Sequence, residues 1–215
     1  MALVTLTAPA AEPVSLAELK DYLRIDAGDT SQDALLTDRG IAAREWAEAY
    51  TERRFITQQL RLWLDFFPGY IDMKLTGQRV STPFVSGANA LLVGLRYAIS
   101  LPCPPVQSID VFKYVDTNGG TTQLTANVGF IADLQSQPAR LAPPFGSVWP
   151  AAQVVPNAIQ IDYTAGYGLA AAVPSGIKTA IKRLTAHWFE NRLPDENDIP
   201  KAVTAALFRY RDLRF

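Results

Sequence analysis

Most of the 15 prolines in this chain of 215 residues lie between Pro68 and Pro174. Proline fixes φ and lacks the N–H that an interior helical turn uses, so this stretch cannot hold long helices. Just before it, Leu60, Leu62 and Leu64 alternate with polar or aromatic residues at the two-residue period of a strand. The middle of the chain is therefore predicted to be antiparallel β-structure with many turns.

Helical spacing of apolar residues appears on both sides of this β-rich middle. Ser15 and Glu18 form a capping-box pair, which predicts a helix that begins after Ser15 and ends near residue 26. Further helices are expected over about 32–53, over about 176–192 and from Pro200 onward. The aromatic residues expected in the core of these helices are Trp46, Trp188 and Phe189.

These patterns predict an α+β fold, in which a bundle of N- and C-terminal helices carries an inserted antiparallel β subdomain. The helical core would comprise residues 1–58 and 170–215, and the β-rich subdomain residues 59–169. Hydrophobic residues make up 48% of the chain and charged residues 19%, which excludes a disordered or coiled-coil protein.

Cysteine, histidine and the apolar segments exclude several classes of protein. The single cysteine, Cys103, cannot form an internal disulfide, and the single histidine, His187, cannot complete a zinc site with it. No apolar run approaches the roughly 18–20 residues of a membrane span. The apolar stretch Met1–Ala11 lacks the basic region of a signal peptide. We expect a soluble, uncleaved cytoplasmic protein with no cofactor and no metal.

The sequence gives little indication of a catalytic site. His187 has no serine or cysteine at a suggestive spacing. The segment Gly166–Gly168 precedes a helix, but it lacks the lysine and the serine or threonine of a phosphate-binding loop. Four carboxylates of the β region leave a hydrolase or cation site open as an alternative, although turn and surface roles suit them better. They are Asp110, Asp116, Asp133 and Asp162.

Charge is unevenly distributed, although the formal net charge is −1. Residues 1–68 hold 7 Lys/Arg against 11 Asp/Glu, whereas residues 175–215 hold 8 against 5. Opposite signs suit head-to-tail contacts between copies, and they suit pairing within one chain equally well. Lys178, Lys182 and Arg183 form a basic stripe that can face a DNA channel, a neighbouring subunit or solvent.

The last seven residues combine basic and aromatic side chains, the types enriched in interface hot spots. This composition favours a tail that docks into a partner protein. The alternative is that Tyr210 and Leu213 pack back onto the chain's own core. The residues of the predicted docking tail are Arg209, Tyr210, Arg211, Leu213, Arg214 and Phe215.

Six segments, taken in order and with their spacing, resemble the head–tail connector (adaptor) family of tailed bacteriophages, whose members are also labelled possible DNA-packaging proteins. The likeness covers most of the chain, and residues 69–98 depart from it as an extra insertion. The segments are VSLAELKDYLRID (Val14–Asp26), AAREWAEAYTERRFITQ (Ala42–Gln58), LPCPPVQSIDVFKYVDTNG (Leu101–Gly119), IDYTAGYG (Ile161–Gly168), VPSGIKTAIKRLTAHWFENR (Val173–Arg192) and PKAVTAALFRYRDLRF (Pro200–Phe215).

The resemblance implies a structural virion protein and not an enzyme. Such a subunit belongs to a ring, generally of twelve copies, that docks under the portal protein at the head–tail interface. A downstream stopper or tail-completion protein binds the other face, and double-stranded DNA passes non-specifically through the centre, with no membrane involved. The protein would lie in the virion, and in the host cytoplasm during assembly. The alternative is an accessory β-domain module for virion decoration or carbohydrate binding.

Overall fold

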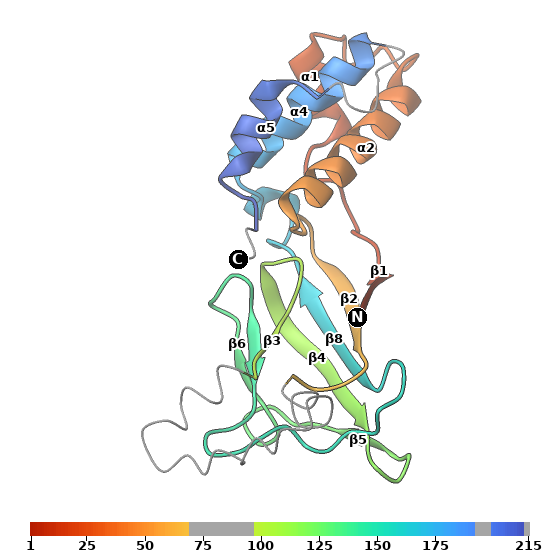
Figure 1. Ribbon diagram of the computed structural model, residues 1–215. Coiled ribbons are helices and arrows are strands. Elements are labelled where there is room, and N and C mark those ends of the chain that lie inside the picture. The colour runs from red at the N-terminus through yellow and green to blue at the C-terminus, as the bar shows by residue number, and fades with distance from the viewer. Residues whose placement is uncertain (69–96, 192–198, 213–215) are drawn as a thin grey trace. The chain divides into compact units, whose positions relative to one another are not determined.

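The computed structural model describes residues 1–68, 97–191 and 199–212, and the chain divides into two compact units (Figure 1). The β unit comprises Met1–Ala8 and Gln59–Ala165, and the helical unit comprises Pro9–Gln58 and Gly166–Phe215. The predicted α+β class is confirmed.

The helical unit is built from four described α-helices and one short 3-10 turn. The predicted capping box is present, because the Ser15 hydroxyl accepts from the Glu18 N–H and the Glu18 carboxylate accepts from the Ser15 N–H. The elements are α1 (Leu16–Leu23), α2 (Asp33–Thr51), η3 (Ala170–Ala172), α4 (Ser175–Glu190) and α5 (Lys201–Phe208).

Aliphatic side chains, not aromatic ones, form most of the core of the helical unit. Ile177, Ile181 and Leu184 of α4 are each at most 1% exposed, and they share one cluster with Ala43 and Ala47 of α2. Their i, i+4, i+7 spacing places them on one helical face.

Trp46, Trp188 and Phe189 were predicted to lie in the core, but none of the three is fully buried. All three side chains are half-buried. Trp46 and Trp188 pack against the edge of the aliphatic cluster, and Trp46 stacks on Tyr50 with ring centroids 5.2 Å apart. Helical periodicity identifies the inward face, but it does not show how far the neighbouring helices extend over that face.

The β unit contains two antiparallel sheets. The five-stranded sheet has the order β1-β2-β8-β4-β5, and the three-stranded sheet has the order β3-β7-β6. The strands are β1 (Ala2–Thr7), β2 (Gln58–Leu64), β3 (Ile99–Ser100), β4 (Val106–Val115), β5 (Thr121–Gln123), β6 (Ile131–Asp133), β7 (Arg140–Ala142) and β8 (Ile159–Ala165).

The core of the β unit combines aliphatic strand residues with an aromatic group. Leu60 and Leu62, which suggested the strand pattern, are fully buried, as are Ile159 and Ile161 of β8. The Phe67 ring stacks on Trp149 with centroids 5.0 Å apart, and Phe112 lies against both Phe67 and Trp149. These rings are buried and provide the large apolar area that a small sheet needs.

Two boundaries differ from the prediction. Residues 1–58 were all expected in the helical core, but Ala2–Thr7 form strand β1 and pair with β2. Residues 166–169 belong to the helical unit and not to the β subdomain. The periodicity of the six residues of β1 is too short to predict a strand from the sequence. Of the predicted insertion, residues 69–96 lie outside the described residues.

None of the described helices has the length and apolar character needed to cross a bilayer.

Candidate assembly surfaces

The end of the described chain is fixed to the C-terminal end of α2. The Asp212 N–H donates to the Thr51 carbonyl at 2.9 Å, and the Arg53 Nε–H donates to the Tyr210 carbonyl. Asp212 itself is only 7% exposed. Three residues of the predicted docking tail, Arg209, Tyr210 and Arg211, therefore lie in or just before a segment that packs onto the protein's own helices.

Aromatic contacts strengthen this attachment. The Arg209 guanidinium lies 4.7 Å from the centroid of the Tyr210 ring and donates to the Tyr210 hydroxyl at 2.6 Å. The Arg211 guanidinium lies 5.5 Å from the ring of Tyr50 on α2. A Cβ at Gly176 would lie 2.8 Å from the Tyr210 hydroxyl, so the tyrosine also approaches the first turn of α4.

The remaining residues of the predicted tail, Leu213, Arg214 and Phe215, lie outside the described residues. The alternative in which Tyr210 packs back onto the core is thus observed for the part of the tail that can be described. A docking role for the whole segment stays a prediction.

The basic stripe of α4 is partly neutralised within the helical unit. The Lys182 Nζ lies 3.3 Å from the Glu18 Oε1 of α1, and Lys178 lies near enough to act on the same carboxylate. The Ser15 N–H and then Lys182 hold the pKa of Glu18 below its usual value. Lys178 is half-buried, and Arg183 is exposed. The stripe therefore offers less free positive charge than its sequence suggests.

A buried polar network ties the C-terminal end of α2 to the segment that follows it. One oxygen of Glu48 accepts from the Phe55 N–H at 2.9 Å and the Gln58 side-chain amide at 3.3 Å. The other oxygen lies 3.3 Å from Arg44 and 3.9 Å from Arg54. Burial raises the pKa of Glu48 although these donors oppose the effect. These charged side chains therefore have a structural role inside the helical unit.

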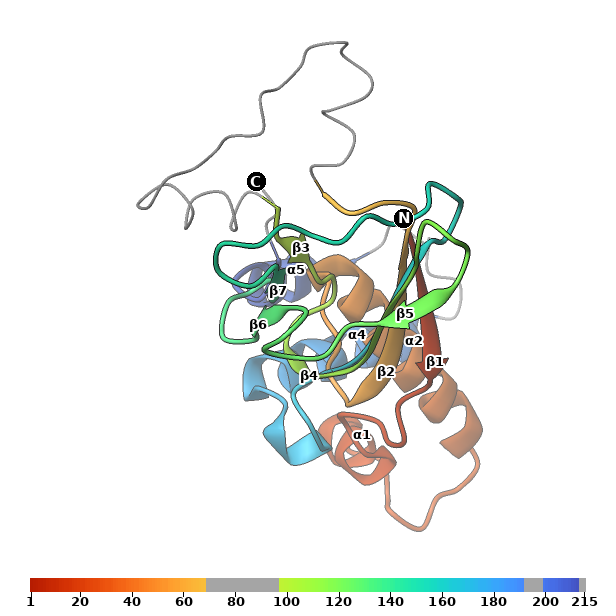
Figure 2. The ribbon, with the colours of Figure 1, turned by 90° about the horizontal axis from the view of Figure 1, so that it is seen from below.

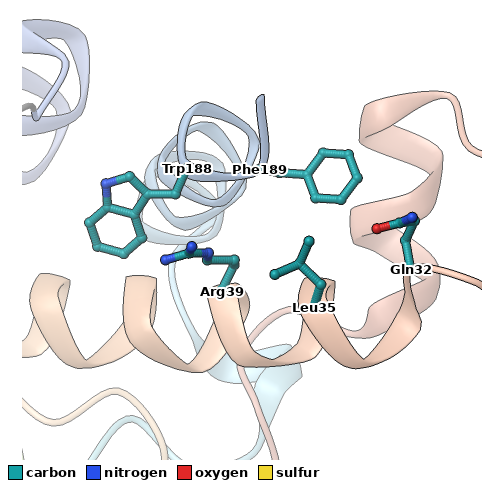
Figure 3. Close-up of a pocket in the computed structure, with 5 residues that line it drawn as sticks. All are labelled: Gln32, Leu35, Arg39, Trp188 and Phe189. Atoms are coloured by element: carbon teal, nitrogen blue, oxygen red, sulfur yellow. The ribbon is translucent and has the colours of Figure 1, made fainter. Parts of the chain in front are cut away.

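A small pocket opens between α2 and the end of α4 (Figure 3). Its volume is about 320 Å³, at the small end of the range of ligand pockets. Leu35 and Arg39 project from α2 toward Trp188 and Phe189 of α4, and Gln32 completes the lining. Among the described residues that line the pocket, none is a carboxylate, histidine or cysteine, so these side chains offer no acid–base pair or nucleophile.

Two carboxylates of the β unit make ion pairs with arginine. Asp162 accepts from the Arg61 Nε–H and Nη2–H, each at 2.7 Å, which links β8 to β2. Asp133 accepts from the Ser136 hydroxyl and from Arg140, each at 2.6 Å. Ser136 and then Arg140 hold the pKa of Asp133 well below its usual range.

The other two carboxylates shape local backbone. Asp116 accepts from the N–H groups of Asn118 and Gly120 in the turn before β5. Asp110 accepts from the hydroxyls of Ser108 and Thr164, each at 2.8 Å. Within the described residues no group of three or more metal-ligating side chains comes together. The carboxylates of the β region thus have turn, strand-linking and surface roles.

These features define a two-unit α+β protein whose polar side chains mainly hold its own elements together. No protein-family model and no curated protein sequence matches the chain.

The same fold occurs in chains of gene transfer agent (GTA) particles. A chain of the neck of an empty GTA particle, computed with C6 symmetry, is 24% identical with a TM-score of 0.71. A chain of the virion of a native GTA particle is 24% identical with a TM-score of 0.69. A chain of the native GTA neck, computed with C12 symmetry, is 23% identical with a TM-score of 0.67. Each match covers 100% of this chain and 97% of the other, and it establishes the shared fold.

Proposed function

We propose that this chain is a structural subunit of the neck of a tailed-phage-like particle, where it forms the head–tail connector (adaptor) ring. The observation that carries the proposal is the fold likeness to GTA neck chains over the full length of both proteins. The ordered sequence segments that resemble the connector family support it independently. The protein would act in the virion at the head–tail interface, without catalysis.

The finer parts of the proposal come from the resemblance of the sequence to the connector family. A ring of twelve copies fits the C12 symmetry with which one of those necks was computed. The ring docks under the portal protein, joins a stopper or tail-completion protein on its other face, and leaves a channel for double-stranded DNA. Affinity for duplex DNA rises with the number of phosphates that a protein neutralises. A chain with a formal net charge of −1 would therefore bind passing DNA weakly and let it slide, which supports the channel role.

The engagement of the β-region carboxylates supports a structural role. Asp162 and Asp133 are held by arginines, and Asp110 and Asp116 bind nearby hydroxyl or backbone groups. Most glycoside hydrolases need two carboxyl groups that face a shared substrate site. The alternative is an accessory β-domain module for virion decoration or carbohydrate binding, and the experiment below distinguishes it from the connector.

The experiment combines assembly and location. The purified chain is mixed with the portal protein of the same particle, and the complexes are measured by light scattering and imaged by negative stain. We expect rings on the portal, and we expect mass spectrometry to find the chain in purified particles. A chain that is absent from particles and does not bind the portal, but does bind glycans on an array, would establish the alternative.

A further inference from the structure

Strand β1 forms one edge of the five-stranded sheet, and β5 forms the other. β1 lies beside β2 (Figure 2). From Ala2 to Thr5 the two strands pair in regular antiparallel register, and a bulge follows at Leu6. The backbone groups on the other side of β1 have no strand partner in the part of the chain that the structure describes.

The described sheet edges differ in how they are protected. Natural edges are short, charged, interrupted by proline or covered, because an open edge pairs with other chains. β3 and β6 have 2 and 3 residues, and β6 ends in Asp133. β5 has 3 residues, TTQ, and lacks charge, proline and glycine, so only its length limits pairing. β1 has 6 residues, ALVTLT, with no charge, proline or glycine. Val4 is 48% exposed and Leu6 is 44% exposed, and the bulge at Leu6 still leaves Ala2–Thr5 open.

We propose that β1 is a self-assembly edge, which pairs with β5 of a neighbouring copy so that the sheet continues from one subunit to the next. This inference rests on the proposed function, since it uses the ring to bring identical copies together. It names the backbone contact that joins them.

The choice of β5 as the occupant follows from the chemistry of an edge and from the symmetry of a ring. The N–H and C=O groups along an edge are complementary to another extended strand. A ring needs two different patches that meet head to tail, whereas β1 on β1 would close a two-fold dimer. β5 (Thr121–Gln123) is uncharged like β1, so the contact buries no unpaired charge.

Two lysine variants block the two edges separately. Val4→Lys blocks β1 and Thr121→Lys blocks β5, and both side chains are exposed, so circular dichroism should show an unchanged fold. Each variant alone should raise the protein concentration at the midpoint of assembly at least about tenfold. Val148→Lys is the control, because Val148 is 71% exposed and lies outside every strand.

Mixing the variants tests the head-to-tail pairing itself. A Val4→Lys copy keeps an open β5, and a Thr121→Lys copy keeps an open β1. A mixture should therefore form heterodimers through one intact contact and nothing larger. Amide hydrogen exchange in residues 2–7 of the unmodified chain should slow on assembly and stay fast in Val4→Lys. If the isolated chain is monomeric, the same variants are compared by ring formation on the portal protein.

The outcomes separate this inference from the function. Rings of unchanged mass from both lysine variants would overturn the β1–β5 contact and leave the connector role standing. Loss of assembly in Val4→Lys only, with Thr121→Lys still forming homodimers and no heterodimers in the mixture, would replace it by β1–β1 pairing. A chain that assembles neither alone nor on the portal would overturn both proposals.

Discussion

At the scale of single residues, several charged side chains of the helical unit are more deeply buried than its tryptophans. Arg44 and Glu48 are 6% and 4% exposed and bind each other inside the helical unit, whereas Trp188 is only half-buried. Buried charges are tolerated because each is paired and hydrogen-bonded. The aliphatic residues of α4 therefore carry most of the apolar stabilisation of that unit.

Substitutions on α4 test this division. Ile181→Ala should lower the free energy of unfolding by about 2–5 kcal/mol, because the side chain is 1% exposed and alanine leaves a cavity. Trp188→Ala should cost only about 1–2 kcal/mol, since a half-buried ring loses part of the transfer energy. Urea unfolding followed by circular dichroism measures both. A tryptophan variant that loses more than the isoleucine variant would contradict the assignment of the core.

At the scale of elements, the packing of residues 166–168 against residues 55–57 inside the helical unit depends on one glycine. Gly166 has a φ of +126°, and a Cβ there would overlap the Ile56 backbone. The neighbouring Tyr167 N–H donates to the Phe55 carbonyl at 3.1 Å, and the Thr57 N–H donates to the Gly168 carbonyl at 3.1 Å. Two segments far apart in sequence thus run together here, and only glycine fits the close approach.

Alanine substitutions separate steric overlap from backbone strain. Gly166→Ala should cost about 2–4 kcal/mol, since strain and overlap with the backbone add. Gly146→Ala is the matched control: its φ is +75°, but no atom lies within 4 Å of the new Cβ. It should cost about 1 kcal/mol. Thermal unfolding compares the two, and equal losses would show that the overlap is relieved cheaply.

At the scale of the whole molecule, the described part of the C-terminal segment stabilises the protein's own fold. The sequence alone predicts that deletion of Arg209–Phe215 leaves a folded protein. The structure predicts that this deletion also destabilises the fold, because Asp212 and Tyr210 are bound to Thr51 and Arg53. A docking function is therefore best tested on the residues that follow Asp212.

Two truncations separate folding from docking. Removal of residues 209–215 should lower the stability of the protein by about 1–3 kcal/mol, through lost hydrogen bonds and packing. Removal of residues 213–215 keeps the contacts of Tyr210 and Asp212 and, if the tail docks, should weaken binding to the portal protein. Calorimetry and a portal pull-down measure the two effects. Unchanged portal binding by the shorter truncation would remove those three residues from the docking contact.

The sequence by itself determined the α+β class, the helices near residues 16, 176 and 200 and the β-rich middle, because periodicity and proline are local signals. It also identified the Ser15–Glu18 cap, whose partners are three residues apart. The tertiary structure alone decided which charges are buried, where the aromatics lie and that Ala2–Thr7 is an edge strand. These features depend on contacts between residues far apart in the chain, such as Arg61 with Asp162 and Thr51 with Asp212, and no local pattern records such contacts.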